Sequence, residues 1–172
     1  MVELDGLSVV LLDHRDHRVA EALVGLQRVS YCVEAELIGD DAIPPLHESV
    51  AALAALDLTF IAITEPDDEP VAALGYQVAD GVLDIDRLAV HPRCFREGLA
   101  RRLLEAVLER VPHERAVVST GRANHPARRL YERVGFVHLD DLAATPTLVV
   151  SRYERLAVGP NPTTVDTTSP WP

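Results

Sequence analysis

The sequence predicts a mixed α/β fold in which helices cover the faces of a central β-sheet. Apolar residues alternate or cluster in short segments typical of strands, and elsewhere recur every three or four positions as in helices. The resulting order along the chain is βααβββαβαββ. Residues 82–120 form a strand, helix and strand that predict a right-handed parallel crossover. The chain of 172 residues is long enough for one domain and too short for two of the usual size.

Turn-forming residues and changes of periodicity set the boundaries of the elements. In chain order the predicted elements are strand 7–12, helices 14–31 and 44–56, strands 58–64, 71–79 and 82–90, helix 97–110, strand 116–120, helix 126–134, and strands 136–142 and 147–155. Residues 1–156 are expected to form the folded domain. Residues 157–172, with four prolines and four threonines, are expected to be a tail outside it.

The first two helices are predicted from spacing and from proline. Val19, Leu23 and Leu26 share one face of the first helix. The second begins at Pro44 or Pro45, because proline is favoured in a first helical turn. The acidic segment between them is expected to be a loop.

The next strands are separated by turns. The segment EPDDEP divides the strands 58–64 and 71–79, since its prolines and acidic residues disfavour regular pairing. Asp80 and Gly81 form the turn before strand 82–90, which ends at His91 and Pro92.

Two amphipathic helices follow. Helix 97–110 has an apolar stripe that includes Leu99, Leu103 and Val107, with arginine and glutamate on the opposite face. Helix 126–134 has proline in its first turn and ends at Gly135. The last two strands come after it.

Charge is distributed unevenly along this acidic chain. The net charge of −11 argues against nucleic acid as a partner. All 16 basic residues are arginines, and 13 of them lie in residues 87–155 against eight acidic residues. Residues 1–86 hold three arginines and 18 acidic residues, so the two halves are expected to face different partners.

Other classes are disfavoured by composition. Two cysteines do not make a disulfide framework, and no apolar run reaches the length of a signal peptide core or of a membrane span. The seven histidines show no metal-ligand spacing, so no metal is expected. We therefore expect a reduced, cytoplasmic protein without membrane contact. The oligomeric state is left open, with a homodimer as one outcome.

The segment RLAVHPRCFREGLARRLLEAVL, residues 87–108, contains the first candidate binding site. Gly98 and Ala100 lie where a helix begins, and small residues there let backbone N–H groups approach an anion such as a pyrophosphate. Four arginines surround the position: Arg93, Arg96, Arg101 and Arg102. A tight loop with solvated arginines is an equally good interpretation of this segment alone. The dinucleotide GxGxxG pattern and the phosphate-binding P-loop are both absent.

The second candidate segment is STGRANHPARRLYERVGF, residues 119–136. Tyr131 shares a helical face with Ala127, Leu130 and Val134, which alone favours a core aromatic residue. Asn124 precedes the helix and is interpreted, on position alone, as a cap.

Together the two segments resemble the GNAT superfamily of acyl-CoA-dependent N-acetyltransferases. The family's loop motif is Gln or Arg, two residues, Gly, one residue, then Gly or Ala; Gly98 and Ala100 match it. Phe95 replaces the usual Gln or Arg, and Arg96 stands where Gly is frequent. The later segment is similar to the family pattern N-x-x-A-x-x-L-Y-x-x-x-G-F, and six residues match: Asn124, Ala127, Leu130, Tyr131, Gly135 and Phe136.

The resemblance implies a mostly antiparallel sheet with one splayed parallel pair, and acetyl-CoA as co-substrate. It implies that the strand Leu88, Ala89 and Val90 holds the pantetheine arm by backbone bonds, and that Asn124 contacts the same arm. The loop and helix start would hold the pyrophosphate; its residues are Phe95, Arg96, Glu97, Gly98, Leu99, Ala100 and Arg101. Tyr131 would lie by the CoA sulfur and protonate the leaving thiolate.

Direct acyl transfer also needs a base, because an ammonium group has no lone pair. Asp84 and Asp86 lie two residues apart and are expected on one strand face with Leu88 and Val90. We rank Asp84 first, since its distance from the loop motif is that of the glutamate of histone-type members, and Asp86 second. The alternative is that one carboxylate pairs with an arginine from a neighbouring strand; Arg87 is expected on the other face.

Two further positions bear on the mechanism. Ser119 replaces the glutamate base of the members that acetylate ribosomal proteins, which makes their mechanism less suitable here. Nothing local marks Cys94 as a thiolate, so direct attack in a ternary complex is preferred over a covalent intermediate.

Four acidic residues are expected in the loop between the first two helices, which in this family forms a lip of the acceptor pocket: Glu34, Glu36, Asp40 and Asp41. They would attract a cationic amine, although a solvated loop explains them equally well.

The predicted function is transfer of an acetyl group from acetyl-CoA to a primary amine of a small molecule or peptide. A non-catalytic acyl-CoA sensor on the same fold and an unrelated α/β nucleotide binder are the alternatives.

Overall fold

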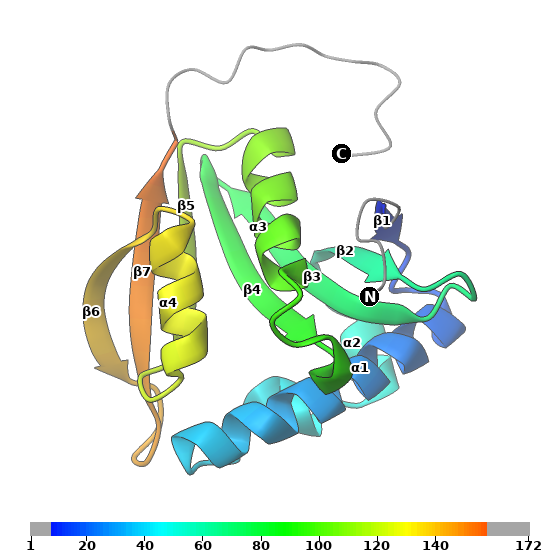
Figure 1. Cartoon of the computed structure of the whole chain (residues 1–172), viewed down its shortest axis with the longest axis horizontal. Coiled ribbons are helices and arrows are strands. Elements are labelled where there is room, and N and C mark those ends of the chain that lie inside the picture. Colours follow the sequence, from blue (N-terminus) through cyan, green and yellow to red (C-terminus); the bar gives the residue numbers. More distant parts are fainter. Residues whose placement is uncertain (1–7, 158–172) are drawn as a thin grey trace.

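The computed structural model describes residues 8–157, and a seven-stranded sheet forms its centre (Figure 1). The strands are β1 (Val9–Leu12), β2 (Thr59–Thr64), β3 (Pro70–Ala79), β4 (Val82–Val90), β5 (Arg115–Gly121), β6 (Val137–Ala143) and β7 (Val149–Leu156). The helices are α1 (His17–Ile38), α2 (Val50–Ala54), α3 (Leu99–Arg110) and α4 (His125–Arg133), with short 3₁₀ turns η2 (Pro44–His47) and η3 (Pro92–Cys94). The predicted tail, residues 157–172, lies outside the described residues except for Ala157.

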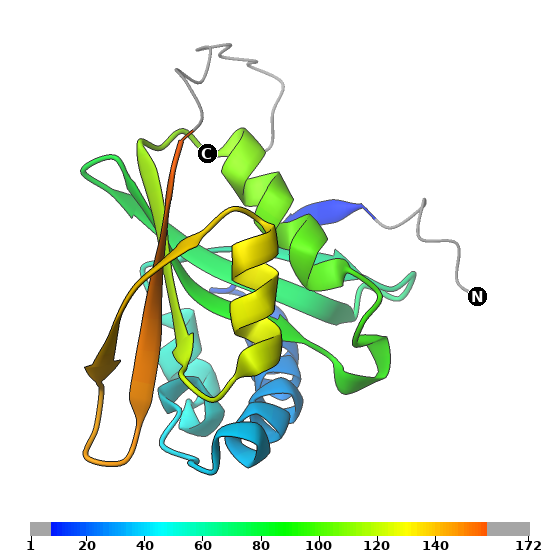
Figure 2. The same ribbon diagram turned by 60° about the vertical axis from the view of Figure 1, so that its left-hand side comes forward.

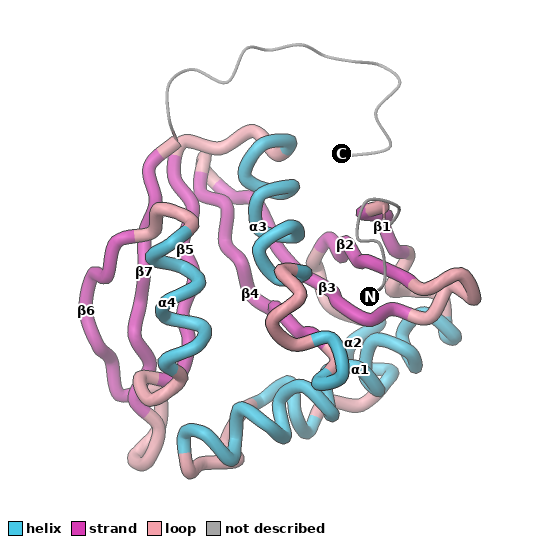
Figure 3. The backbone as a smooth tube through the Cα atoms, in the orientation of Figure 1, coloured by secondary structure: helices cyan, strands magenta, loops and turns pink. Residues whose placement is uncertain are grey.

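The sheet order is β1-β2-β3-β4-β5-β7-β6, and every neighbouring pair is antiparallel except β4 and β5 (Figure 3). This confirms the predicted fold class, the element order and the parallel unit over residues 82–120. Helix α3 connects the two parallel strands, as a crossover between parallel strands requires.

Helices cover the two faces of the sheet separately (Figure 2). Leu103 and Leu104 of α3 and Tyr131 of α4 belong to one buried apolar cluster with the sheet. Leu23 of α1 and Leu53 of α2 belong to a second cluster on the opposite face. The apolar stripe predicted for α3 is therefore the face that it buries.

Helix α1 is longer than predicted and includes most of the acidic segment. It begins after Asp16, whose carboxylate accepts hydrogen bonds from two backbone N–H groups of the first turn, and ends at Gly39 with φ +70°. The prediction that residues 32–38 form a loop is wrong, because Glu, Ala and Leu favour helix and residues 32–38 contain no Gly or Pro. Glu34 and Glu36 are consequently helical, whereas Asp40 and Asp41 lie in the loop.

The second helix is shorter than predicted. Residues 44–47 form the 3₁₀ turn η2, Glu48 is extended, and α2 begins only after Ser49, whose hydroxyl accepts a hydrogen bond from the Ala52 N–H. The break at Glu48 directs its carboxylate toward the sheet, where it meets Arg87.

A β-bulge in β4 changes which side chains face which helices. Gly75 pairs with Arg87 and Tyr76 pairs with Ile85, so Asp86 is an extra residue in β4. Leu83 and Ile85 face the α3 cluster before the bulge, and Leu88 and Val90 pack against the same cluster after it. The prediction that Asp84 and Asp86 share a face with Leu88 and Val90 is therefore wrong, because the bulge shifts the alternation by one residue.

Arg87 follows the bulge and faces α1 with its guanidinium buried. It donates to Glu48 at 2.6 and 3.2 Å, to Gln27 of α1 at 3.4 Å and to Asp86 at 3.0 Å. Arg87 and Glu48 expose 9% and 10% of their side chains. The expectation that Arg87 is a poor partner for the nearby carboxylates is wrong for Asp86.

We predict that Glu48→Gln lowers the free energy of unfolding by about 3 kcal/mol, because it leaves a buried guanidinium without its main counter-charge. Urea denaturation measures this change. Glu105→Gln is the matched control: its exposed pair with Arg101 should contribute less than about 0.5 kcal/mol. Equal losses in the two variants would contradict a structural role for the buried pair.

Candidate active site

The strands β4 and β5 separate halfway along their length. Their pairing joins residues 82–85 of β4 to residues 115–118 of β5 and goes no further. The remainder of β4, residues 86–90, and the end of β5, residues 119–121, diverge and leave an opening in the sheet (Figure 1). The predicted splayed pair is present.

The edge of β4 at the opening offers backbone hydrogen-bonding groups. The His91 N–H donates to Val71 C=O of β3, which means that alternate residues of β4, Ala89 among them, direct their backbone groups to β3. Leu88 and Val90 therefore direct theirs toward the opening. The Val90 N–H donates to Ser30 Oγ of α1 at 3.2 Å, so α1 borders the opening as well.

The loop after β4 leads into the start of α3 with unusual backbone angles. Arg96 and Gly98 have φ values of +68° and +80°. Gly98 provides no side-chain cap, and the first helical N–H with an acceptor inside α3 is that of Arg102, which donates to Gly98 C=O. The N–H groups of residues 99–101 consequently have no intrahelical partner and point out of the helix start. This arrangement suits an anion.

Arginines near the helix start differ in their pairing. Arg93 pairs with Glu65 at 2.5 Å, and Arg101 pairs with Glu105 at 2.7 Å. Arg96 is exposed and forms no ion pair with any described residue, while Phe95 exposes 41% of its surface. The structure thus places all the predicted loop residues, 95–101, at this one turn.

Helix α4 places Tyr131 beside the opening. Asn124 caps this helix: its side-chain oxygen accepts a hydrogen bond from the Ala127 N–H at 3.1 Å. The cap predicted from its position is confirmed. Tyr131 is 4% exposed, with ring centroids 5.8 Å from Tyr153 and 6.0 Å from Phe136. Burial, and then the negative charge of Glu34, raise the pKa of Tyr131 above its ordinary value of 10. The hydroxyl therefore keeps its proton at neutral pH.

Glu34 lies at the opening. It is on helix α1, although the sequence predicted a loop for this residue. Its carboxylate accepts a hydrogen bond from Thr120 Oγ1 of β5 at 3.2 Å. Tyr31, one turn earlier on α1, is buried, and burial followed by the Glu34 charge raises the pKa of its hydroxyl. The uninterrupted helix-forming residues 32–38 were the signal that could have located Glu34.

The two aspartates proposed as bases have different surroundings. Asp84 pairs in register with Val117 in the closed part of the parallel pair, and accepts a hydrogen bond from Gln77 Nε2 at 3.4 Å. Asp86 is held by Arg87. Their catalytic roles remain predictions.

Cys94 lies in the loop before α3. Burial, and then the charge of Glu97, raise the pKa of its thiol. A raised pKa disfavours the thiolate, so Cys94 is a poor nucleophile.

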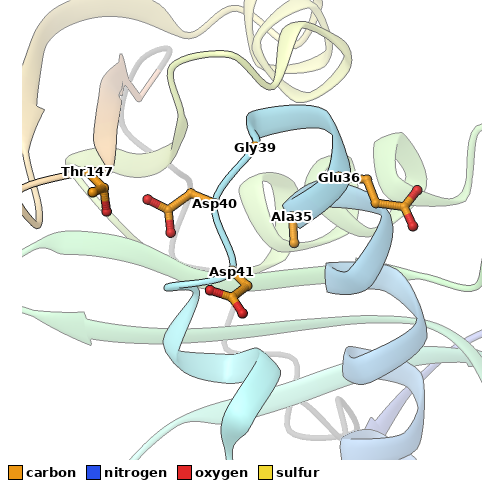
Figure 4. Close-up of a pocket in the computed structure, with 6 residues that line it drawn as sticks. All are labelled: Ala35, Glu36, Gly39, Asp40, Asp41 and Thr147. Atoms are coloured by element: carbon orange, nitrogen blue, oxygen red, sulfur yellow. The ribbon is translucent and has the colours of Figure 1, made fainter.

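An open acidic pocket lies between the end of α1 and the turn joining β6 and β7 (Figure 4). It is lined by Ala35, Glu36, Gly39, Asp40, Asp41 and Thr147. Hydrogen bonds from the Thr147 hydroxyl and the Ala42 N–H lower the pKa of Asp40. Glu36, Asp40 and Asp41 thus gather at one rim, while Glu34 is directed to Thr120 instead.

Residues 8–157 contain neither a group of side chains placed to bind a metal nor a membrane-spanning helix. No group of three His, Cys, Asp or Glu side chains in this range is placed to hold a metal ion. No helix there is long and apolar enough to cross a membrane.

A sequence model described as "Acetyltransferase (GNAT) family" matches residues 27–136. The chain belongs to the GNAT acetyltransferase family. The matched range runs from α1 through α4 and contains the opening, the loop before α3 and Tyr131. The alternative of an unrelated α/β nucleotide binder is therefore wrong.

One curated protein and two solved structures illustrate what the chain is similar to. The UPF0157 protein YqkA of Bacillus subtilis (strain 168) is 31% identical over 144 residues, or 83% of this chain and 42% of YqkA, so the chain spans less than half of that relative. The ribosomal-protein-S18-alanine N-acetyltransferase of Escherichia coli has a TM-score of 0.71 at 17% identity, covering 91% of this chain and 97% of the other. An aminoglycoside 6'-N-acetyltransferase complexed with coenzyme A has a TM-score of 0.67 at 14% identity, covering 88% and 98%. At these identities the two structures show the fold alone.

We predict that this GNAT protein loses stability steeply above pH 10. Burial raises the pKa of Tyr31, Tyr76 and Tyr131 in the folded state, so the unfolded state loses these protons at lower pH. The stability that these protonated hydroxyls contribute is fully present below pH 10. Above pH 10 the free energy of unfolding falls by up to about 1.4 kcal/mol per pH unit per tyrosine. The chain contains no lysine, which removes the usual alkaline titration of amines.

Tyrosinate absorbance at 295 nm and urea midpoints from pH 9 to 11.5 measure this effect. Tyr131→Phe should make the alkaline decrease shallower by the share of one tyrosine. Ionisation of all four tyrosines near pH 10 in protein that is still folded would contradict the prediction.

Proposed function

We propose that the chain transfers an acetyl group from acetyl-CoA to a primary amine by direct attack in a ternary complex. The observation that supports this most is the convergence of three features on the opening between β4 and β5. These are the unpaired edge of β4, the uncapped start of α3 and the protonated hydroxyl of Tyr131. Each suits a different part of acetyl-CoA.

The phosphates would bind at the start of α3, where the N–H groups of residues 99–101 have no intrahelical acceptor. Arg96 would supply the cation nearest to that turn. The pantetheine arm would run along β4, using the backbone C=O groups of Leu88 and Val90, because the Val90 N–H already bonds Ser30. Asn124 has a free amide NH₂ for the same arm, since only its carbonyl oxygen is used in capping α4.

The thioester would lie between β4 and α4, with its sulfur near Tyr131. As the carbon–sulfur bond breaks, the electron pair leaves with the sulfur, and the Tyr131 hydroxyl donates a proton to it. The acceptor amine must lose a proton before it attacks. The sequence proposes Asp84, then Asp86, for that step, and both lie on β4 within the family's matched range.

A cationic amine suits the acidic pocket near the end of α1. Glu36, Asp40 and Asp41 line it, and the first 86 residues carry most of the acidic side chains of the chain. An excess of negative charge raises the local concentration of a cation. The acceptor would therefore enter from the side opposite to the phosphates.

A non-catalytic acyl-CoA sensor is the second candidate. The observation that favours it is Phe95, an exposed aromatic residue where the family motif has Gln or Arg. Thermal stabilisation by acetyl-CoA without thiol release, across a broad panel of amines, would establish this alternative.

We predict that Gly98→Ala raises the dissociation constant of acetyl-CoA about tenfold, because an L-residue at φ +80° costs about 1–2 kcal/mol and distorts the phosphate-binding turn. Isothermal titration calorimetry measures the change. Gly39→Ala is the matched control: Gly39 has φ +70°, and at both positions an added Cβ meets nothing within 4 Å. The same loss of affinity in both variants would point to general strain rather than to a phosphate site.

Tyr131→Phe should lower kcat for acetyl transfer about 100-fold and leave the affinity for acetyl-CoA unchanged, since only the proton donor is removed. CoA release measured across an amine library provides the assay. Tyr153→Phe is the control, because it removes a hydroxyl from the adjacent buried ring and should change kcat less than threefold. Unchanged turnover in Tyr131→Phe would remove Tyr131 from the mechanism.

A further inference from the structure

Glu34 reaches through the opening in the sheet to the face covered by α4. On β5, Thr120 has the same orientation as Ala116 and Val118, which pack in the cluster of α3 and α4. Helix α1 packs on the opposite face, yet its Glu34 accepts the hydrogen bond from Thr120. The carboxylate therefore lies within the opening itself, two residues beyond the last residue of β5 that pairs with β4.

A close contact holds the end of α1 in this position. A Cβ atom added at Gly121 would lie 2.9 Å from Cγ2 of Ile38, a distance that real Cβ atoms do not tolerate. Glycine at this position thus lets the last turn of α1 press against the end of β5. Ser30, one turn before Glu34, bonds the Val90 N–H of β4. The segment 30–38 is therefore fixed to both strands that border the opening.

The charge of Glu34 acts on two tyrosine hydroxyls. After burial, it is the next cause of the raised pKa of both Tyr31 and Tyr131. In acyl transfer, the group that protonates sulfur and the group that deprotonates nitrogen act on atoms bonded to the same carbon. Both groups must then lie near that centre. Glu34 is held at the open end of β5 by its bond to Thr120, and its charge acts on the Tyr131 hydroxyl.

The two aspartates of β4 fit this requirement less well. Asp84 lies where β4 and β5 are still paired, and its side chain is on the face opposite to Leu88 because of the bulge. Asp86 is engaged by the guanidinium of Arg87. Of the carboxylates considered for the base, Glu34 alone is bonded to a residue of β5 beyond the paired segment.

We infer that Glu34 is the general base, accepting the proton of the acceptor ammonium directly or through one water; this inference rests on the proposed function. The amine nitrogen loses two protons in all. The first goes to Glu34 and then to solvent, the nitrogen lone pair forms the C–N bond, and the C–S bond breaks. The second proton leaves the nitrogen after attack and replaces the one that Tyr131 gives to the sulfur.

The groups around Glu34 come from four elements. Tyr31 lies on α1, Tyr131 lies on α4, and Arg87 and Asp86 of β4 act on the same Tyr31 hydroxyl. Thr120 of β5 contributes a hydroxyl that does not titrate. Burial raises the pKa of both tyrosines, so neither hydroxyl is ionised to act as a base at neutral pH.

The test is the pH profile of acetyl transfer by the full chain, using CoA release with the best amine from the library. Glu34→Gln should lower kcat about 100-fold at pH 7, and its rate should rise with pH in proportion to the free amine. At pH values near the pKa of the acceptor it should approach the wild-type rate. That recovery also shows that the variant is folded.

Three controls separate proton transfer from charge and packing. Glu21→Gln makes the same change on an exposed face of α1 and should leave the profile unaltered. Glu34→Asp retains the carboxylate and should recover part of the lost rate. An aromatic amine acceptor, which is neutral at pH 7, should reduce the deficit of Glu34→Gln to less than about tenfold.

The outcomes distinguish this inference from the function beneath it. If the wild type releases no CoA with any amine, the proposed function fails. If the wild type is active and Glu34→Gln keeps the wild-type rate and profile, Glu34 is not the base. If the decrease of the rate at low pH disappears in Asp84→Asn and is unaltered in Glu34→Gln, then Asp84 is the base. A deficit in Glu34→Gln confined to KM would indicate amine binding alone and would also overturn the inference.

Discussion

The single unpaired residue in β4, Asp86, is the constraint on which the site depends. A bulge bends its strand and increases the local twist. Here β4 pairs with β5 up to Ile85, and the two strands separate from the bulge onward. A straight strand would have continued the parallel ladder and closed the opening. The backbone groups of Leu88 and Val90 would then have been bonded to β5, whereas here the Val90 N–H bonds Ser30 of α1.

The same bulge introduces a charged group into the core beneath the site. By shifting the alternation of side chains, it turns Arg87 toward α1, where Glu48 and Gln27 are its partners. A buried ion pair contributes little net stability compared with apolar packing, but breaking it is costly. It therefore acts mainly as a specific connection between the segment after η2 and the bent part of β4. This contact fixes α1 and the bent part of β4 relative to one another.

Local patterns predicted the elements well, because strand alternation and helical stripes report on burial one segment at a time. Strand β4 was predicted with its observed limits, and the stripe of Leu99, Leu103 and Val107 is the buried face of α3. The faces of β4 beyond Asp86 could not be predicted, since a bulge depends on pairing with β3 and leaves no mark in the sequence of β4 itself. The end of α1 was misjudged for another reason. The acidic residues of this segment suggest a loop, but their helix propensity and the position of Gly39 favour a longer helix.

Separation of charge along the chain corresponds to a separation in space around the opening. The arginine-rich second half contains the loop and helix start that suit phosphates, and the acidic first half contains α1 and the acidic pocket. Helix α1 brings one of those acidic residues, Glu34, to Thr120 of the second half, and the Glu34 charge helps to raise the pKa of Tyr131. An anionic donor and a cationic acceptor would thus be drawn to the opening from different sides. The two groups suited to moving protons lie where the sides meet, because the bulge has separated the strands there and the helix is long enough to reach across.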